Sequence, residues 1–522
     1  MGARPTRLRG AILLPALAAV ALGAGCGQPT DEAATPAAPG ARPLRRGLGA
    51  EAGTLDPRLA DDNAALAVVG DLYEGLTTET RNGSIVPGAA EAWTVDADGL
   101  AYEFRLREGL RWSNGDALTA AHFAAGLRAV LDPHGTAPGA ALLEAVAGVD
   151  IVDERGLRIR LRHPLPWLPA LLAMPLGAPL HPGPATSGSA PVNGPYRLLR
   201  RLPGERIELE RNPHYRAAST VAIERVDHLP VTDIATELKL YRAGDLELTS
   251  EVPNAQLPFL RTGLPGELRV SPYLSVYAYA VNLSRLTDRG ARLALAMATD
   301  RERITRQVTG AGEAPAFGWV PDGIPGYHAS RFEWHDLPYE AAVATARGLW
   351  RTARSAGAAP RRLKLCTDAS ENHHRTAVAL ADLWRTALGV ETEIVELEWQ
   401  VYLDTRHHPG DCDLVRLGWS ADFVDPEAFA AVFESGNVQN TLGYASAVYD
   451  GLLQQSRLEP DPALRMALLA RAEAQLLDDV PVIPVFFRVS KRLVKPYVQG
   501  VGANPLGHVA SRDLSFTGIT AN

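Results

Sequence analysis

The chain has 522 residues, of which 46% are hydrophobic and 21% are charged, and its formal net charge is −8. A body of roughly 500 residues exceeds one hydrophobic core, so two or three globular domains are expected. Acidic and basic residues are mixed along the chain, and this excludes the basic stripe that is typical of nucleic-acid-binding proteins.

The N-terminus has the order of an export signal. Three arginines within the first nine residues precede the apolar run 11–22, and small residues then lead to Cys26. The apolar run is too short to span a bilayer, which takes roughly 20 residues. A cysteine after small residues resembles a bacterial lipobox, in which the thiol is lipidated, although Leu22 lies four residues before the cysteine rather than three. We predict a signal peptide over 1–25 and a membrane anchor at Cys26. The alternative is an ordinary cleaved signal, and both interpretations export the protein.

The segment after the cysteine is poor in large apolar residues. Residues 27–43 are mostly Ala, Pro, Gly and Thr. Such a stretch cannot bury enough surface to offset the entropy of ordering it. We therefore predict a tether over 26–44 that connects the anchor to a globular body.

The first half of the body shows strand patterns and one capped helix. Residues 101–107 alternate apolar and polar side chains, which predicts a half-buried strand. Thr119 is placed to cap a helix that runs through Leu131 and ends at Asp132-Pro133. Residues 192–212 predict two strands around the turn Pro203-Gly204.

The second half alternates strands and helices. This order implies parallel strands joined by right-handed crossovers. One helix is expected to bury Val378, Ala381, Trp384 and Leu388 and to end at Gly389. A later helix, capped by Asp461 and begun by Pro462, is expected to bury Leu464, Leu468, Ala472 and Leu476. The predicted elements are strand 362–366, helix 372–388, strand 390–397, helix 401–406, strand 413–418, the helix after 461 and strand 480–489.

Two cysteines remain if Cys26 is lipidated. An even pair in an exported protein could form a disulfide. However, Cys366 ends one predicted strand and Cys412 begins another, so the two would lie far apart even on parallel neighbours. We predict two free thiols.

Motifs of catalysis and metal binding are missing from the sequence. It contains no G-x-S-x-G elbow, no H-E-x-x-H and no Walker loop. The run Asp96-Ala97-Asp98-Gly99 lacks the further ligands of a calcium loop. The pairs His373-His374 and His407-His408 are not preformed chelates, because adjacent side chains on a helix diverge by about 100°. We predict a protein that is not an enzyme and needs no cofactor.

Several segments in order resemble the extracytoplasmic solute-binding proteins of family 5, the oligopeptide- and dipeptide-binding proteins of ABC transporters. The match covers residue 45 to the C-terminus, and its later segments are similar to the oligopeptide branch. The segments are LDP at 55–57, DLYEGL at 71–76, VPGAAEAW at 86–93, YEFRLR at 102–107, WSNG at 112–115, TAAHF at 119–123, NGPY at 193–196, ERNPHY at 210–215, Trp399, DTRH at 404–407, VRLGWSAD at 415–422 and LVKP at 493–496.

The resemblance implies an α/β fold of three domains, the type II periplasmic-binding-protein fold with mixed and parallel sheets. Domain I would combine 45–73, 185–274 and 490–522. Domain II would be 74–184, and domain III would be 275–489. The ligand would lie between domains I and III, which close by a hinge.

The resemblance also implies a peptide site. A binder that ignores sequence must recognise the two charged termini and the backbone. Asp422 matches the aspartate that pairs with the peptide ammonium, because a buried ammonium needs an anion. The alternative is a solvated loop carboxylate or a helix cap.

Arg416, Arg406 and His373 match positions that meet the carboxylate of peptides of different length. For these three residues an internal role, such as a salt bridge for Arg416, is the alternative. Trp399 and Trp419 would be pocket walls, and Gly418 would let the peptide backbone pair with a strand edge.

Two departures from the family pattern concern the pocket. Pro138-Gly139 stands where relatives carry a proline and an aromatic residue. Ser420, which we include in the site, stands where some relatives have a bridged cysteine.

The expected partners are oligopeptides, the permease subunits of an ABC transporter and, through the lipid anchor, a membrane. The protein is expected to be an extracytoplasmic monomer that does not bind nucleic acid. Alternatives are a sensor lipoprotein that reports peptides, a relative that binds a murein peptide, a nickel complex or an oligosaccharide, and a hydrolase, which the missing motifs disfavour.

Overall fold

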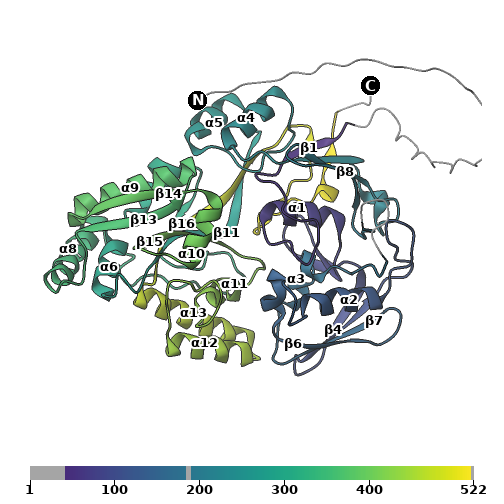
Figure 1. Cartoon of the computed structure of the whole chain (residues 1–522), viewed down its shortest axis with the longest axis horizontal. Coiled ribbons are helices and arrows are strands. Elements are labelled where there is room, and N and C mark those ends of the chain that lie inside the picture. Colours follow the sequence, from purple (N-terminus) through teal and green to yellow (C-terminus); the bar gives the residue numbers. More distant parts are fainter. Residues whose placement is uncertain (1–41, 184–189, 519–522) are drawn as a thin grey trace, which may run out of the picture. The chain divides into compact units, whose positions relative to one another are not determined.

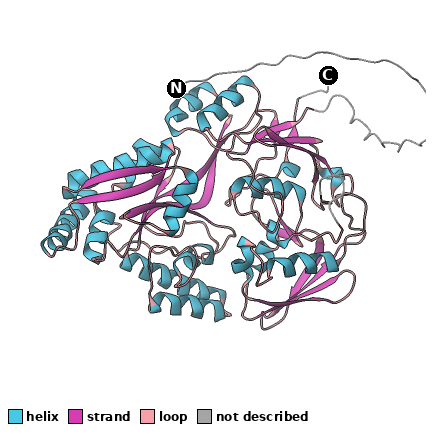
Figure 2. Cartoon of the chain, in the orientation of Figure 1, coloured by secondary structure: helices cyan, strands magenta, loops and turns pink. Residues whose placement is uncertain are grey.

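The computed structural model describes residues 42–183 and 190–518, and these residues belong to one compact unit (Figure 1). The predicted signal peptide, the lipidation at Cys26 and most of the tether lie outside the described residues. The strands of this unit form three larger sheets. Figure 2 shows the strands in magenta, with helices in cyan beside them.

The first sheet has four strands in the order β1-β10-β9-β8. Its strands are β1 Leu44–Gly47, β8 Tyr196–Leu202, β9 Arg206–Arg211 and β10 Arg225–Leu229. The predicted hairpin is confirmed, because β8 and β9 are antiparallel and join at Gly204, whose positive φ of 73° suits glycine. Helix α1, Asn63–Leu72, packs its apolar residues against this sheet.

The second sheet is antiparallel and has the order β4-β5-β7-β6. Its strands are β4 Ala90–Val95, β5 Ala101–Leu106, β6 Val146–Ile151 and β7 Gly156–Leu161. The predicted strand and capped helix are both confirmed here. Helix α2, Ala120–Val130, begins with a capping box in which Thr119 and His122 exchange hydrogen bonds with each other's backbone.

The third sheet has six strands in the order β12-β16-β11-β15-β13-β14. The strands are β11 Leu268–Val281, β12 Ala314–Pro315, β13 Arg362–Asp368, β14 Glu391–Leu397, β15 Leu414–Ser420 and β16 Val482–Leu493. Strand β13 is parallel to both β14 and β15, as the strand–helix alternation predicts. Buried residues of α6 (Arg289–Met297), α8 (Tyr339–Ser355) and α9 (Glu371–Leu388) share a core with Tyr277 on one face. Those of α12 (Ala447–Leu458) and α13 (Pro462–Asp479) share a core with Val276 on the other.

The remaining elements are short strands and the helices that connect or cover the sheets. Two pairs of short strands are β2 Thr77–Glu79 with β3 Ile85–Pro87, and β17 Val498–Gln499 with β18 Ser515–Phe516. The helices are α3 Leu168–Leu171, α4 Ile234–Ala243, α5 Leu257–Gly263, α6 Arg289–Met297, α7 Arg301–Ile304, α8 Tyr339–Ser355, α9 Glu371–Leu388, α10 Trp399–His407, α11 Glu427–Ala430, α12 Ala447–Leu458 and α13 Pro462–Asp479.

Two predicted helices exist, but part of their predicted inner faces is wrong. Gly389 ends α9 in the left-handed conformation and Asp461 caps α13, as expected. However, Val378 of α9 is 45% exposed and Leu464 of α13 is 57% exposed. The apolar residues of a helix do not all lie on its buried face, since the neighbours that cover it decide which stripe is inside.

The prediction of two free thiols is wrong. Cys366 and Cys412 form a disulfide with a Cα–Cα distance of 6.0 Å. Cys366 does not end β13 but lies within it, opposite Val415 of β15. The chain before β15 does not run straight, since the Cys412 N–H donates to the carbonyl of Pro409. This turn brings the second cysteine beside the first.

The predicted boundaries of domains I and III fall inside two paired strands. Strands β11 and β16 run through residues 274–275 and 489–490 and pair along most of their length. Their register shifts between Pro272 and Val276, close to both boundaries. The three-domain division itself stays a prediction.

Candidate functional site

Four predicted site residues lie on β15, and Asp422 follows two residues after the strand ends. Because side chains alternate along a strand, Arg416, Gly418 and Ser420 share one face, and Trp419 lies on the other. The pairing of Gly418 with Tyr277 of β11 puts the first three over the face that carries α9. Trp419 packs against the opposite core, where its indole N–H donates to the Ala428 carbonyl at 2.6 Å.

The β13 side of β15 is open beyond Val415. Pairing between β13 and β15 is recorded only for Leu414 and Val415. On the other side, the Ala421 N–H donates to the Leu274 carbonyl at 2.9 Å. Since hydrogen-bonded pairs alternate in an antiparallel ladder, the backbone N–H and C=O groups of Gly418 and Ser420 point away from β11. The edge is therefore placed to pair with another extended chain.

Gly418 leaves room beside the edge of β15 because it has no side chain. A Cβ atom at this position would lie 3.0 Å from Nη1 of Arg416, a tight contact that the end of this flexible side chain relieves by moving a few tenths of an ångström. A larger residue would have to displace the guanidinium. The absence of a side chain also lets a ligand backbone approach the strand closely.

Asp422 has no recorded partner among residues 42–183 and 190–518. It is half-buried, and no hydrogen bond or ion pair is recorded for its side chain within the described part of the chain. Burial raises the pKa of Asp422, and the neighbouring His508 acts in the opposite direction. That histidine is itself paired with Glu79 at 2.7 Å. A desolvated anion of this kind is stabilised by a cation that arrives with a ligand.

Arg416 already has an internal anion. Its Nε lies 2.7 Å from Oδ1 of Asp368, although the two are not aligned as a hydrogen bond. The guanidinium carbon lies 4.7 Å from the centre of the Tyr402 ring, whose hydroxyl donates to the Arg416 carbonyl at 2.8 Å. The internal salt bridge that the sequence left open is thus present. Its Nη groups remain the donors that a ligand could reach.

Asp368 joins Arg416 to His373. It accepts a hydrogen bond from Nδ1 of His373 at 2.9 Å. Burial acts to raise the pKa of Asp368, but the His373 hydrogen bond and the Arg416 charge outweigh it and lower this pKa to about 2. Sequence reasoning missed Asp368, which lies at the end of β13 five residues before His373. The parallel pairing of β13 with β15 is the signal that could have found it.

His373 is held in its neutral form. Burial, followed by the charge of Arg416, lowers the pKa of His373. Because an ionised carboxylate only accepts hydrogen bonds, Nδ1 carries the hydrogen and Nε2 is left as an acceptor. His373 can therefore bind a second carboxylate only after it gains a proton.

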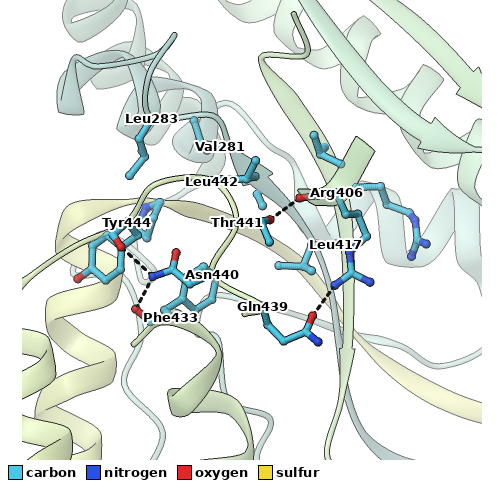
Figure 3. Close-up of a pocket in the computed structure, with 14 residues that line it drawn as sticks. Val281, Leu283, Arg406, Leu417, Phe433, Gln439, Asn440, Thr441, Leu442 and Tyr444 are labelled. Atoms are coloured by element: carbon cyan, nitrogen blue, oxygen red, sulfur yellow. Dashed lines mark hydrogen bonds between the residues drawn. The ribbon is translucent and has the colours of Figure 1, made fainter. Parts of the chain in front are cut away.

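Arg406, on helix α10, lines a cavity of about 20 Å³ together with Arg416 (Figure 3). Its guanidinium donates to Oε1 of Gln439 at 3.3 Å, and its carbonyl accepts a hydrogen bond from the Thr441 hydroxyl. Burial lowers the pKa of Arg406. The cavity holds little more than one water molecule, so no peptide fits inside it.

Three further residues of the candidate site are Trp399 and Ser420, which the sequence predicted, and Arg488, which it did not. Trp399 is 50% exposed and its ring centre lies 5.5 Å from that of Tyr402. The hydroxyl of Ser420 accepts from the Tyr273 hydroxyl at 2.9 Å. Arg488 of β16 was missed by sequence reasoning. Its side chain is half-buried, and its guanidinium carbon lies 5.9 Å from the centre of the Tyr273 ring. No ion pair is recorded for it among the described residues.

The described residues contain neither a metal-binding cluster nor a membrane-spanning helix. No group of three or more His, Cys, Asp or Glu side chains there could hold a metal ion. No helix among these residues has the length and apolar character to cross a bilayer.

Comparison with known proteins identifies the family. Residues 84–441 match the model of the bacterial extracellular solute-binding proteins, family 5 Middle. The chain belongs to this family. It is therefore a solute-binding protein of ABC transport rather than an enzyme, and the expected α/β periplasmic-binding-protein fold is confirmed.

Relatives and solved structures match nearly the whole chain. The probable deoxycholate-binding periplasmic protein YgiS of Escherichia coli is 34% identical, with 88% of this chain and 91% of the relative covered. The periplasmic oligopeptide-binding protein OppA of the same organism is 31% identical, with 90% and 92% covered. The crystal structure of Haemophilus influenzae OppA in complex with RPPGFSPFR has a TM-score of 0.82 at 30% identity and covers 91% of this chain and 98% of that one.

Proposed function

We propose that this protein captures oligopeptides outside the cytoplasmic membrane and delivers them to an ABC permease. The observation that carries the proposal is Asp422, a desolvated carboxylate without a recorded partner beside an open strand edge. A peptide supplies the ammonium that Asp422 lacks and the backbone groups that the edge of β15 can pair with.

The spacing along β15 suits a short extended peptide. Asp422 and Arg416 are six residues apart, and an extended chain rises about 3.3 Å per residue, so about 20 Å separates the two positions. A peptide with its N-terminus at Asp422 would run antiparallel to β15. Its carboxylate would meet the Nη groups of Arg416, or of Arg406 or protonated His373 at another length, while Trp399 and Trp419 would flank side chains.

The relatives support a peptide but leave other solutes open. The OppA relatives are named as oligopeptide-binding, and YgiS is named as a probable deoxycholate-binding protein. Deoxycholate carries a carboxylate and no cation, so Asp422 would repel it. A murein peptide keeps the ammonium and fits the same argument, whereas an oligosaccharide has no charge for Asp422.

Ligand binding would bring the two lobes together. In the proposed three-domain division, Asp422 and β15 belong to domain III and His508 belongs to domain I. A ligand that contacts both lobes binds the closed form more tightly, and that difference drives closure. Lipidation of Cys26 would hold the protein at the membrane. Genes for a permease and an ATPase beside its own would favour import over a sensor.

Native mass spectrometry of the protein as purified tests the proposal. Intact peptides of a few residues should be released on denaturation, and an added tripeptide should bind with a compaction visible by small-angle scattering. Copurified bile acid, or no binding of any peptide, would show that the proposal is wrong. Cleavage of an added peptide would show a hydrolase.

A further inference from the structure

A second pocket, of about 160 Å³, lies between the β11–β16 ladder and the segment 501–509. Its polar lining comes from Arg269 and Ser271 of β11, Ser490 and Arg492 of β16, and Asn504 and His508 of the segment. On this measure a cavity of about 10–15 Å³ already holds one water molecule, so the pocket has room for several water-sized groups. This is enough for the side chain of an aspartate or a glutamate.

The lining of this pocket is positively charged. Arg269 and Arg492 are directly opposite each other in the β11–β16 register, an arrangement that like charges disfavour. No ion pair is recorded for either arginine in residues 42–183 and 190–518, and no lining residue is an Asp or a Glu.

The bonds of Arg492 are to neutral groups. Its Nη2 donates to the Ser490 hydroxyl at 3.0 Å and to the Gly507 carbonyl at 2.8 Å. Burial lowers the pKa of Arg492 to about 10. Arg492 is half-buried and Arg269 opposite it is exposed. An anion between them would stabilise both, and guanidinium groups bind carboxylates through two parallel hydrogen bonds.

The pocket adjoins the site of Asp422. His508 lines the pocket and is also the residue whose charge acts on Asp422. Tyr273 lies two residues after Ser271 on β11, and its ring lies beside Gly507 of the pocket. The Tyr273 hydroxyl donates a hydrogen bond to the Ser420 hydroxyl, close to the Asp422 end of β15. A peptide anchored at Asp422 therefore has its first residues next to the pocket.

We infer that this pocket binds the carboxylate of an acidic side chain near the N-terminus of a bound peptide, with Arg269 and Arg492 as its partners. The inference rests on the proposed peptide-binding function. The C-terminal carboxylate of a short peptide has the same chemistry and must be distinguished by experiment.

Calorimetry with matched tetrapeptides at pH 7.5 tests the inference. The peptides carry Glu or Gln at the second or third position, or Asp or Asn at the first, in an otherwise all-alanine sequence. At one of these positions the acidic peptide should bind about tenfold tighter than its amide, the range expected for hydrogen bonds to charged groups. Each pair is also measured with an amidated C-terminus.

The variant Arg269→Gln should reduce this preference to under about threefold and leave the affinity for the amide peptides unchanged. Arg269 is exposed, and no side-chain hydrogen bond is recorded for it in the described residues, so the substitution leaves the fold intact. Arg361→Gln, which removes another exposed arginine for which no ion pair is recorded there, is the matched control and should keep the preference.

Other results would overturn the inference in distinguishable ways. Tight binding of every peptide without an acidic preference would refute the pocket and keep the proposed function. Loss of the Arg269 effect on amidation of the C-terminus would assign the pocket to the peptide terminus. Failure of every peptide to bind would refute the proposed function as well.

Discussion

Replacement of Asp422 by asparagine separates binding from folding. The substitution keeps the shape of the side chain and removes its charge. In the free protein no ion pair is recorded for Asp422 within the described residues, so the change orphans no partner. In the complex it leaves the peptide ammonium buried without an anion, which typically costs about 3–5 kcal/mol. Affinity should fall by a factor of roughly 150 to 5,000.

Asp422→Asn should lose peptide affinity, but the ligand-free variant should be at least as stable as the wild type. Burial raises the pKa of Asp422 above its ordinary value of 3.8, so the folded wild type loses stability as the pH rises through that value toward the raised pKa. Asparagine removes this loss, and the free variant should melt at the same temperature as the wild type or higher at pH 7. Peptide affinity of the wild type should fall on acidification below the raised pKa, and that of the variant should not.

The assay is a two-by-two comparison by calorimetry. Wild type and Asp422→Asn are each titrated with trialanine and with N-acetyl-trialanine, and Asp61→Asn, which changes an exposed aspartate without a recorded ion pair among the described residues, serves as the matched control. Acetylation should weaken wild-type binding strongly and variant binding little. Equal losses on acetylation in both proteins, or variant binding within about threefold of wild type, would refute the anchor, since threefold is under 1 kcal/mol.

Four further outcomes are expected. Gly418→Ala should displace the Arg416 guanidinium and weaken peptide binding while the melting temperature stays close to wild type; unchanged affinity would contradict the open-edge argument. Asp368→Asn should destabilise the fold by about 3–5 kcal/mol at pH 7, because it leaves Arg416 buried without its anion. The stability that this carboxylate contributes is present above pH 3.8 and is lost as the pH falls toward about 2, so the difference between urea melts of wild type and variant should narrow by about 2.5 kcal/mol there. Reduction of the disulfide, which spans 46 residues, should lower the free energy of unfolding by about 4 kcal/mol, and no loss would show that the bond does not constrain the unfolded chain. Cys26→Ser should move the protein from the membrane fraction to the supernatant, whereas unchanged fractionation would refute the lipid anchor.

Local patterns in the sequence determined several of the helices and strands, one hairpin and the parallel pairing of β13. Thr119 caps α2 and Gly389 ends α9 because both act through their own backbone and the next few residues. The parallel pairing of β13 with its neighbours followed from the strand–helix alternation. The position of Asp422 came from a run of residues that resembles a family motif, and its lack of a recorded partner came from the structure.

The disulfide and the pairing of charged side chains depend on tertiary contacts, which local sequence patterns do not determine. The disulfide depended on a turn at Pro409 and on the extension of β13 past Cys366, and neither leaves a periodic signal. The partner of Arg416 is Asp368, 48 positions earlier, which only the register of two strands brings within 2.7 Å. The sequence determines which groups can carry charge and where strands begin. Which charges neutralise one another, and which are left for a ligand, depends on distances of a few ångströms between segments far apart in the chain.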